Sequence, residues 1–373
     1  MKRITLAISA LFLTLGIAMP ILGGDVNIGG DFNFRFRHNL DKDAGNKGFQ
    51  LYEFELFIDA AVHKNVSIFG ELPIYHSNRI DLGNAWIDFH KDGELAATGY
   101  TGLMLGHIMP WFGFYGYDDN QSWMYGGRTT TNSILARAEA IDGTVMRDRQ
   151  VGIAANIKLG SFLFTPQIYN GSGYWAVAGG TDNDNAKDIV FRAQYTLPNE
   201  IGRFGLGYWN SPKTKGALEP SRGTAYGGSG VKHPRDIQRV GAFFQFPNVP
   251  HATVPDLSLG DKPFTVFGEY ILSQFKGNAD APGYEADFKA TGYWVEANVR
   301  IVRNKLVGVL RYDFLDPNQD IKNNEITGIT PALKWEAVPM VFLTLGYEFY
   351  DGGENVGKIK NDDRIAVEMS VQF

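Results

Sequence analysis

The feature that most constrains this chain is a side-chain period of two that recurs from one end to the other. The last ten residues, Arg364 to Phe373, place apolar side chains at every odd position and polar or small ones at every even position. In a β-strand successive side chains point to opposite faces, so such a segment has one apolar and one polar face. Segments 26–37, 52–62 and 341–349 alternate in the same way. The pattern predicts a chain built of amphipathic strands, in a soluble sandwich or in a membrane barrel.

Weaker alternating segments lie between these four and bring the expected number of strands to about sixteen. No stretch outside the N-terminal region shows the periodicity of an amphipathic helix. The expected strands are roughly 26–37, 52–62, 66–75, 80–89, 102–108, 149–159, 161–170, 188–197, 203–209, 239–246, 264–273, 290–301, 305–314, 327–335, 341–349 and 364–373.

The connections between these strands alternate in length. Those after even-numbered strands are mostly short, whereas those after odd-numbered strands are mostly long, and the longest is 109–148. Three connections depart from this rule, namely 90–101 and 247–263, which are long, and 76–79, which is short. Outer-membrane β-barrels combine short periplasmic turns with long external loops. The alternation therefore favours a membrane barrel over a soluble sandwich.

The N-terminus has the pattern of an export signal. Lys2 and Arg3 precede an apolar run from Ile4 to Leu22. We interpret residues 1–24 as a signal peptide, with an uncleaved membrane anchor as the alternative. No later stretch approaches the ~18 continuous apolar residues of a spanning helix. Residues 25–373 would therefore cross a membrane only as a closed, all-β, antiparallel barrel, which satisfies its backbone groups internally.

Composition narrows the possible functions. The chain has no cysteine, which excludes disulfides, thiolate metal sites, a cysteine nucleophile and a lipid-modified cysteine anchor. The formal net charge is −6 and shows no basic surplus, so we expect no nucleic-acid partner. Together with the export signal, the alternating strands and the alternating loop lengths predict location in a bacterial outer membrane.

Four stretches resemble the bacterial outer-membrane porin superfamily, most closely its phosphate- and polyphosphate-selective type. Asn84–Phe89 resembles an early strand of that family, and Gly102–Gly113 resembles its strand ending in Pro-Phe-Gly. Arg149–Gly173 resembles its central hairpin with an Asn-Gly tip, and Asn183–Asp188 resembles the entry to the next strand. The terminal strand, which ends on Phe373, resembles the signal read by the barrel-assembly machinery.

The resemblance implies a trimer of sixteen-stranded barrels, each with a water-filled lumen narrowed by an inward-folded loop. Such a channel passes small hydrophilic solutes or ions, including anions such as phosphate, down their gradient without a reaction or cofactor. Lipid and lipopolysaccharide would be its membrane partners. The alternatives are a non-channel barrel that acts on lipid as an enzyme, and a structural or electron-conduit barrel.

Three groups of charged residues are candidates for controlling passage. The resemblance makes 109–148 the constriction loop, where opposed charges would create a transverse field. The basic 210–238 loop would attract anions to the mouth, or bind lipopolysaccharide phosphates. Wall candidates face the lumen by alternation, although each can equally be a solvated wall residue, and no row of arginines stands out. The loop candidates are Asp118, Asp119, Arg128, Arg137, Glu139, Asp142, Arg147 and Arg149; the mouth candidates are Lys213, Lys215, Arg222, Lys232 and Arg235; the wall candidates are Arg35, Arg37, Glu53, Glu55, Asp59, Arg192, Arg300 and Arg311.

Catalytic and metal motifs are missing from the sequence. No His-Glu-x-x-His occurs, and the seven histidines show no metal-ligand spacing. Ser172 and Ser229 lie in glycine-rich turns that do not match a nucleophile elbow. Residues 182–185 alternate Asp and Asn but lack the glycine and distal glutamate of a calcium loop. We therefore expect no enzyme activity and no bound metal.

Overall fold

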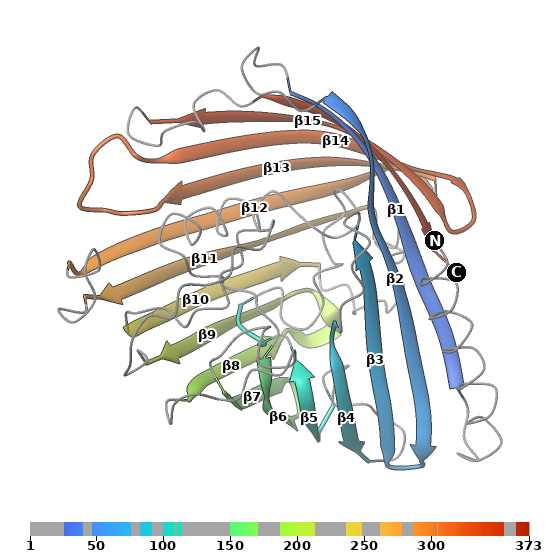
Figure 1. The fold of residues 1–373 in the computed structure, drawn as a ribbon, viewed down its shortest axis with the longest axis vertical. Coiled ribbons are helices and arrows are strands. Elements are labelled where there is room, and N and C mark those ends of the chain that lie inside the picture. Colours follow the sequence, from blue (N-terminus) through green and yellow to red (C-terminus); the bar gives the residue numbers. More distant parts are fainter. Residues whose placement is uncertain are drawn as a thin grey trace.

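The computed structural model contains a closed antiparallel β-barrel (Figure 1). It describes residues 26–39, 47–75, 83–91, 100–108, 110–113, 150–170, 187–212, 236–247, 262–277, 286–303, 305–353 and 363–372. For residues 33, 35, 37–39, 47–53, 75 and 200 only the backbone is described. The signal-peptide prediction for 1–24 lies outside these residues.

Sixteen strands lie within the described residues, one for each strand expected from the sequence. They are β1 (Val26–Asn39), β2 (Lys47–His63), β3 (Val66–Tyr75), β4 (Ala85–His90), β5 (Gly102–Ile108), β6 (Gln150–Leu159), β7 (Phe162–Tyr169), β8 (Asp188–Thr196), β9 (Arg203–Ser211), β10 (Asp236–Phe246), β11 (Phe264–Lys276), β12 (Phe288–Val302), β13 (Leu306–Asp316), β14 (Ile326–Val338), β15 (Val341–Gly352) and β16 (Arg364–Gln372).

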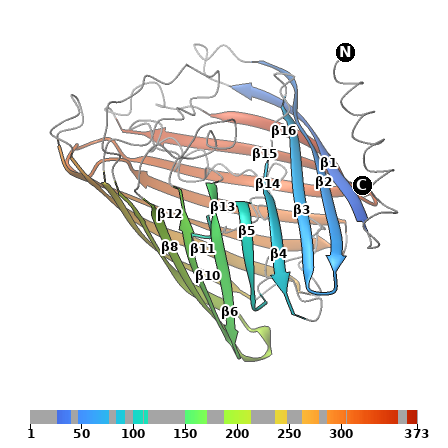
Figure 2. The same cartoon turned by 60° about the horizontal axis from the view of Figure 1, so that its bottom comes forward.

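Each strand pairs with its neighbours in sequence, and β16 pairs with β1 to close the ring. The seam runs from Asp31 opposite Gln372 to Asn39 opposite Arg364. The first and last strands, β1 and β16, therefore lie side by side (Figure 2). An even number of antiparallel strands places the start of β1 and the end of β16 at the same end of the barrel.

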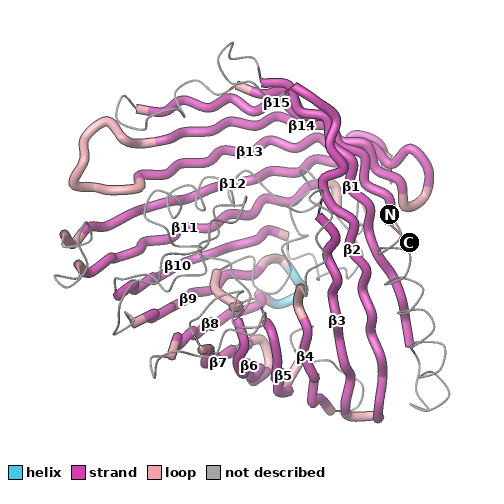
Figure 3. Tube along the Cα trace, viewed as in Figure 1, coloured by secondary structure: helices cyan, strands magenta, loops and turns pink. Residues whose placement is uncertain are grey.

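That end also carries the short turns, and we call it the short-turn end; the other is the long-loop end. Short turns join β2 to β3, β6 to β7, β12 to β13 and β14 to β15. Within the described residues, one 3₁₀ turn, Pro198–Glu200 (η4), lies between β8 and β9 and is the helical segment in Figure 3. No helix in the described part of the chain is long and apolar enough to cross a bilayer.

The two faces of the sheet differ as the alternation predicts. In β13, Leu310 and Tyr312 point outward and are exposed, whereas Arg311 and Asp313 point inward and are fully buried. The same contrast recurs around the ring, with apolar residues outside and charged or amide residues inside. A closed sheet with an apolar exterior is one of the two architectures that can span a bilayer. The described barrel is therefore a membrane-spanning one with a polar interior.

Aromatic rings form a row on the outer face near the short-turn end. Phe162, Tyr195, Phe204 and Phe244 occupy one level on β7 to β10. The Phe162 and Tyr195 ring centroids are 4.7 Å apart, and those of Tyr195 and Phe204 are 5.5 Å apart. Aromatic girdles mark the membrane–water interface in outer-membrane barrels. This row indicates where one bilayer surface meets the wall.

Some strands begin or end at other residues than expected, because polar residues extend the hydrogen-bonded pairing with the neighbouring strand. β2 begins at Lys47 because its pairing with β1 resumes beyond a bulge between Asn33 and Phe34. β4 begins at Ala85 rather than near 80. The two preceding residues, Gly83 and Asn84, are nevertheless hydrogen-bonded to the backbone of Glu71. Alternation fades where a strand leaves the membrane, because neither face must then be apolar.

Candidate functional site

The chain leaving β5 turns into the barrel and runs along the inner face of its wall. The side-chain amide of Gln167 (β7) pairs with both backbone groups of Trp111: the Trp111 N–H donates to Oε1 at 2.7 Å, and Nε2 donates to the Trp111 carbonyl at 2.8 Å. Tyr169 donates its hydroxyl to the same Oε1 at 2.7 Å. Arg192 (β8) donates from Nε to the Gly113 carbonyl at 2.9 Å. Residues 110–113 are thus held against β7 and β8 like a short extra strand.

Two glycines on the wall make room for the ring of Phe112. A Cβ added at Gly207 (β9) would lie 3.0 Å from that ring, and one at Gly241 (β10) would lie 3.1 Å from it. The ring also meets Trp209 edge-on, with 6.0 Å between centroids. Gly113 follows with φ +72°, and a Cβ there would overlap Oε1 of Glu269 (β11). The absence of side chains at 113, 207 and 241 therefore lets this segment cross five strands in close contact.

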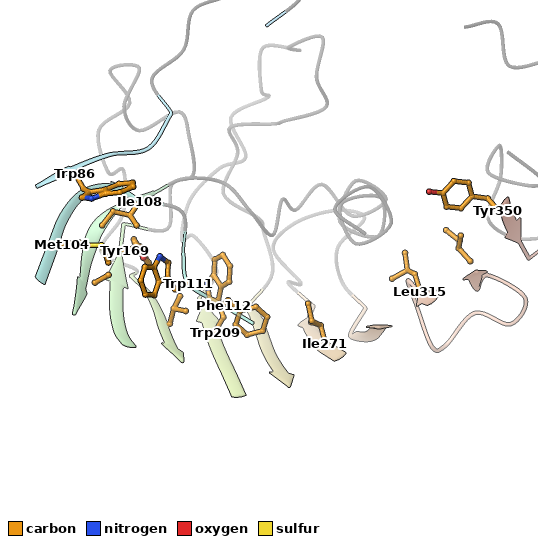
Figure 4. Packing of buried hydrophobic residues seen from close by; sticks show 13 residues of the cluster. Trp86, Met104, Ile108, Trp111, Phe112, Tyr169, Trp209, Ile271, Leu315 and Tyr350 are labelled. Carbon is orange, nitrogen blue, oxygen red and sulfur yellow. The ribbon is translucent and has the colours of Figure 1, made fainter. Parts of the chain in front are cut away.

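Buried apolar side chains surround this segment on the inner face toward the long-loop end. Trp111 and Phe112 belong to one cluster with wall residues from β4, β5, β7 and β9, namely Trp86, Met104, Ile108, Tyr169 and Trp209 (Figure 4). Beside the cluster, Asp188 (β8) links its strand to β6 and β9. Its carboxylate accepts hydrogen bonds from Gln150 at 3.1 Å, Trp209 at 3.1 Å and Ser211 at 2.7 Å. The cluster holds Trp111 and Phe112 against the inner face of the wall.

Three arginines lie along the inner face of β8 to β10. In the strand register Arg239 (β10) lies opposite Trp209 (β9), and Arg192 (β8) lies opposite Gly207 (β9). Arg203 lies on β9, six residues from Trp209 toward the short-turn end. At about 3.3 Å per residue these arginines cover ~20 Å of the wall. All three are buried, and the Arg192 and Arg239 guanidiniums lie 4.5 Å from the Phe243 ring and 5.1 Å from the Trp209 ring. We call Arg192, Arg203 and Arg239 the arginine track.

Five acidic residues with described side chains lie on the inner face of β1 to β4, which also includes the positions of Arg35 and Arg37. These strands lie half-way round the ring from β9 to β12, and Figure 2 shows them on the opposite wall. Glu71 is held by the backbone N–H and side-chain amide of Asn84 at 3.0 and 2.6 Å. Opposed walls of unlike charge produce a field across a lumen. The described acids there are Asp31, Glu55, Asp59, Glu71 and Asp88.

A saturated ion cluster lies on the inner face of β12 and β13. Arg311 donates from Nε and Nη2 to Asp313 at 2.9–3.0 Å and from Nη1 to Glu296 at 3.3 Å. Its guanidinium lies 4.4 Å from the Trp294 ring, and Asn298 donates to Glu296 at 3.1 Å. These groups satisfy one another and reinforce the wall. Within the described chain, no group of three His, Cys, Asp or Glu residues could hold a metal ion.

The wall candidates named from the sequence lie where alternation placed them. Glu55, Asp59, Arg192, Arg300 and Arg311 are on the inner face. Arg35, Arg37 and Glu53 occupy inner-face positions of β1 and β2, and their side chains are not described. All the loop and mouth candidates lie outside the described residues: Asp118, Asp119, Arg128, Arg137, Glu139, Asp142, Arg147, Arg149, Lys213, Lys215, Arg222, Lys232 and Arg235.

Sequence reasoning missed Arg203, Arg239 and Gln167. Both arginines are the first residue of an expected strand, 203–209 or 239–246, where the apolar alternation that assigns a face is weakest. Counting back from Gly205 and Gly207 along β9, or from Phe243 along β10, would have placed them inside. With them, the arginines form the row that the sequence alone did not indicate. No pattern in the sequence links Gln167 to Trp111.

The structure is a closed sixteen-stranded antiparallel β-barrel with an apolar exterior and a polar interior, the architecture of outer-membrane barrels. No protein-family model matches the sequence, and no curated protein matches it. Among solved structures, the chain is similar to an anion-selective porin from Comamonas acidovorans, with 11% identity, 94% of this chain and 99% of that chain covered, and a TM-score of 0.60. It is similar to the outer membrane channel DcaP of Acinetobacter baumannii, with 11% identity, 94% and 97% covered, and a TM-score of 0.59.

A third similar structure is OmpT, an outer membrane protein of Vibrio cholerae in a trimer form. It shares 11% identity over 94% of this chain and 99% of that chain, with a TM-score of 0.58. At such identities the shared property is the fold, over nearly the whole of each chain. The barrel and its apolar exterior accordingly place the protein in a bacterial outer membrane.

Proposed function

We propose that the protein is a porin that lets small hydrophilic solutes diffuse passively across the outer membrane and favours anions. The observation that carries the anion preference is the arginine track on β8 to β10. Fixed positive charge in a lumen lowers the barrier for anions and raises it for cations. The likeness to the Comamonas anion-selective porin supports this preference. Phosphate is one of the small anions that such a channel would admit.

The 109–148 loop is the proposed constriction. Support comes from its first residues, because Gln167 and Arg192 direct 110–113 along the inner wall rather than away from the barrel. We further propose a homotrimer, in line with the trimer form of the similar Vibrio protein. The charged loops 109–148 and 210–238 would then tune selectivity at the constriction and at the mouth.

Reversal potentials in planar bilayers test this proposal. In a gradient of potassium chloride, the channel should favour chloride, and Arg203→Gln and Arg239→Gln should each lower the chloride-to-potassium permeability ratio. Arg303→Gln is the matched control, because Arg303 is exposed in the turn between β12 and β13. A barrel that conducts no ions, or that hydrolyses lipid through a serine, would overturn the porin proposal. Unchanged ratios in both track variants would overturn the anion preference alone.

A further inference from the structure

An apolar groove of about 810 Å³ lies on the outer face of β12 to β16, the strands drawn in orange and red in Figure 1. Every residue that lines it belongs to the described part of the chain. One side is a row of residues that lie opposite one another in the strand register, namely Val299, Gly308, Leu333 and Leu345. The other side consists of residues one pleat further along the strands, namely Ala297, Leu310, Pro331, Tyr347 and Ile365.

Gly308 opens the groove because it has no side chain between larger neighbours. A Cβ at this position would lie 3.2 Å from Cδ1 of Ile301, and every other contact would be 3.7 Å or longer. The Ile301 side chain is itself exposed on the outer face, so it can turn aside. A larger side chain at position 308 would therefore fill part of the groove without displacing the sheet.

The length of the groove favours a hydrocarbon chain as its occupant. From Ile301 on β12 to Ile365 on β16 it crosses four strand spacings of about 4.8 Å, or ~19 Å in total. The hydrocarbon of one leaflet is ~15 Å thick, half of a ~30 Å bilayer core. One lipid acyl chain can thus follow the groove, whereas a single side chain from a second copy of the protein would fill only a small part of it.

The end of the groove at Ile301 has positive charge beside it. The turn that follows β12 lies at the short-turn end and contains the exposed residues Arg303 and Lys305. Arg303 already interacts within the protein, which leaves Lys305 as the candidate for binding an external anion. Glu336 lies next to this turn, since its backbone N–H donates to the Lys305 carbonyl at 2.8 Å, but the two cations outnumber it.

The opposite end of the groove carries negative charge on the outer face. There the Tyr347 hydroxyl donates to the Asp363 carboxylate at 3.4 Å. The neighbouring Arg364 lies on the inner face, opposite Glu348, with its guanidinium 6.0 Å from the Tyr350 ring. An anionic head group is therefore attracted to the end near Lys305 and repelled from the end near Asp363.

We propose that this groove binds one acyl chain of an anionic phospholipid from the leaflet at the short-turn end. The Lys305 ammonium donates to the lipid phosphate, and the chain extends past Gly308 toward Tyr347. The site faces the bilayer rather than the lumen, so it goes beyond the proposed channel function and does not depend on it.

Native mass spectrometry of the full chain, purified in detergent and mixed with lipid, tests the site. The two probes are phosphatidylglycerol and phosphatidylcholine with identical acyl chains, which differ in the net charge of the head group. The parent protein should retain one phosphatidylglycerol per subunit and bind phosphatidylcholine more weakly. Lys305→Gln should weaken the binding of phosphatidylglycerol about fivefold, as expected for one cation beside an anionic head group. Gly308→Leu should abolish the retention of both lipids.

The matched control variants lie on β3 and in the turn before it. Lys64→Gln removes an equal charge at the short-turn end, from an exposed residue in the turn between β2 and β3. Gly70→Leu adds an equal side chain to the outer face of β3, where a Cβ meets nothing within 4 Å. Both control variants should retain phosphatidylglycerol as the parent protein does.

Three results would overturn the proposed lipid site. The first is equal retention of the two lipids by the parent protein, and the second is unchanged retention in Gly308→Leu. The third is dissociation of the oligomer by Gly308→Leu without loss of lipid, which would mean that a second copy of the chain covers the groove. Conductance in potassium chloride tests the porin proposal separately, so the two failures are distinguishable.

Discussion

At the scale of single residues, the inner wall contains a buried ion cluster in which each charged side chain needs its partners. Arg311 and Glu296 are 0% exposed, and Asp313 is equally buried. The three groups neutralise and hydrogen-bond one another, so their desolvation is largely compensated. Removing one partner leaves the others buried and unpaired, which costs much more than the intact cluster contributes.

We therefore expect Arg311→Leu to lower the free energy of unfolding by about 3–5 kcal/mol. The change strands two buried carboxylates, which must then take up protons or be hydrated. Urea titration of the protein in phospholipid vesicles, followed by tryptophan fluorescence, measures the loss. A variant that also carries Glu296→Gln and Asp313→Asn should recover most of it. A single variant as stable as the parent would refute the assigned role.

Gly113 is a second position where one residue decides local geometry. Its φ of +72° lies in the left-handed region, and its missing side chain admits the Glu269 carboxylate. Gly113→Ala should push the segment off the wall and speed trypsin cleavage within 109–148, at Arg128 or Arg137. Gly70→Ala is the control, because a Cβ at Gly70 meets nothing within 4 Å. Equal cleavage rates in both variants would contradict this expectation.

At the scale of elements, the segment that follows β5 is anchored to the wall. The strand ladder of β5 ends at Ile108, and the side chain of Gln167 then hydrogen-bonds the backbone of Trp111. Gln167→Leu keeps the side chain's size but removes both bonds to the Trp111 backbone. We expect greater open-channel current noise, since the start of the loop then loses both hydrogen bonds that Gln167 makes to the Trp111 backbone. Single-channel recording provides the measurement. Gln245→Leu makes the same change on β10 away from the segment, and equal noise in the two variants would argue against the anchor.

The elements themselves were largely predictable from the sequence. The existence and order of all sixteen strands were predicted, because one apolar face toward lipid and one polar face toward water enforce a clear period of two. Strand ends were less accurate, as Lys47 and Asp236 show, because ladders extend with polar residues beyond the bilayer. The inward path of 110–113 was predicted only through a family resemblance. Its cause lies in contacts between residues as distant as Trp111 and Gln167.

At the scale of the whole molecule, the order of the strands in the ring determines which charged residues face one another across the lumen. Arg203 and Arg239 lie on β9 and β10, and Asp31, Glu55 and Asp59 lie half a circumference away on β1 and β2. Net charge could not reveal this separation, because −6 counts outer loops and lumen wall alike. The wall residues could be assigned by alternation, but the arrangement of unlike charges across the lumen required the closed ring.

The β1–β16 seam has a consequence for biogenesis. Asp31 and Gln372 come from opposite ends of the chain, yet they are direct neighbours in the sheet. A ribosome releases the C-terminal partner last, so no part of the nascent polypeptide can complete the cylinder during synthesis. Until then, both open sheet edges expose unpaired backbone groups that invite aggregation. The cylinder can consequently close only after the whole chain is available and β16 has reached β1.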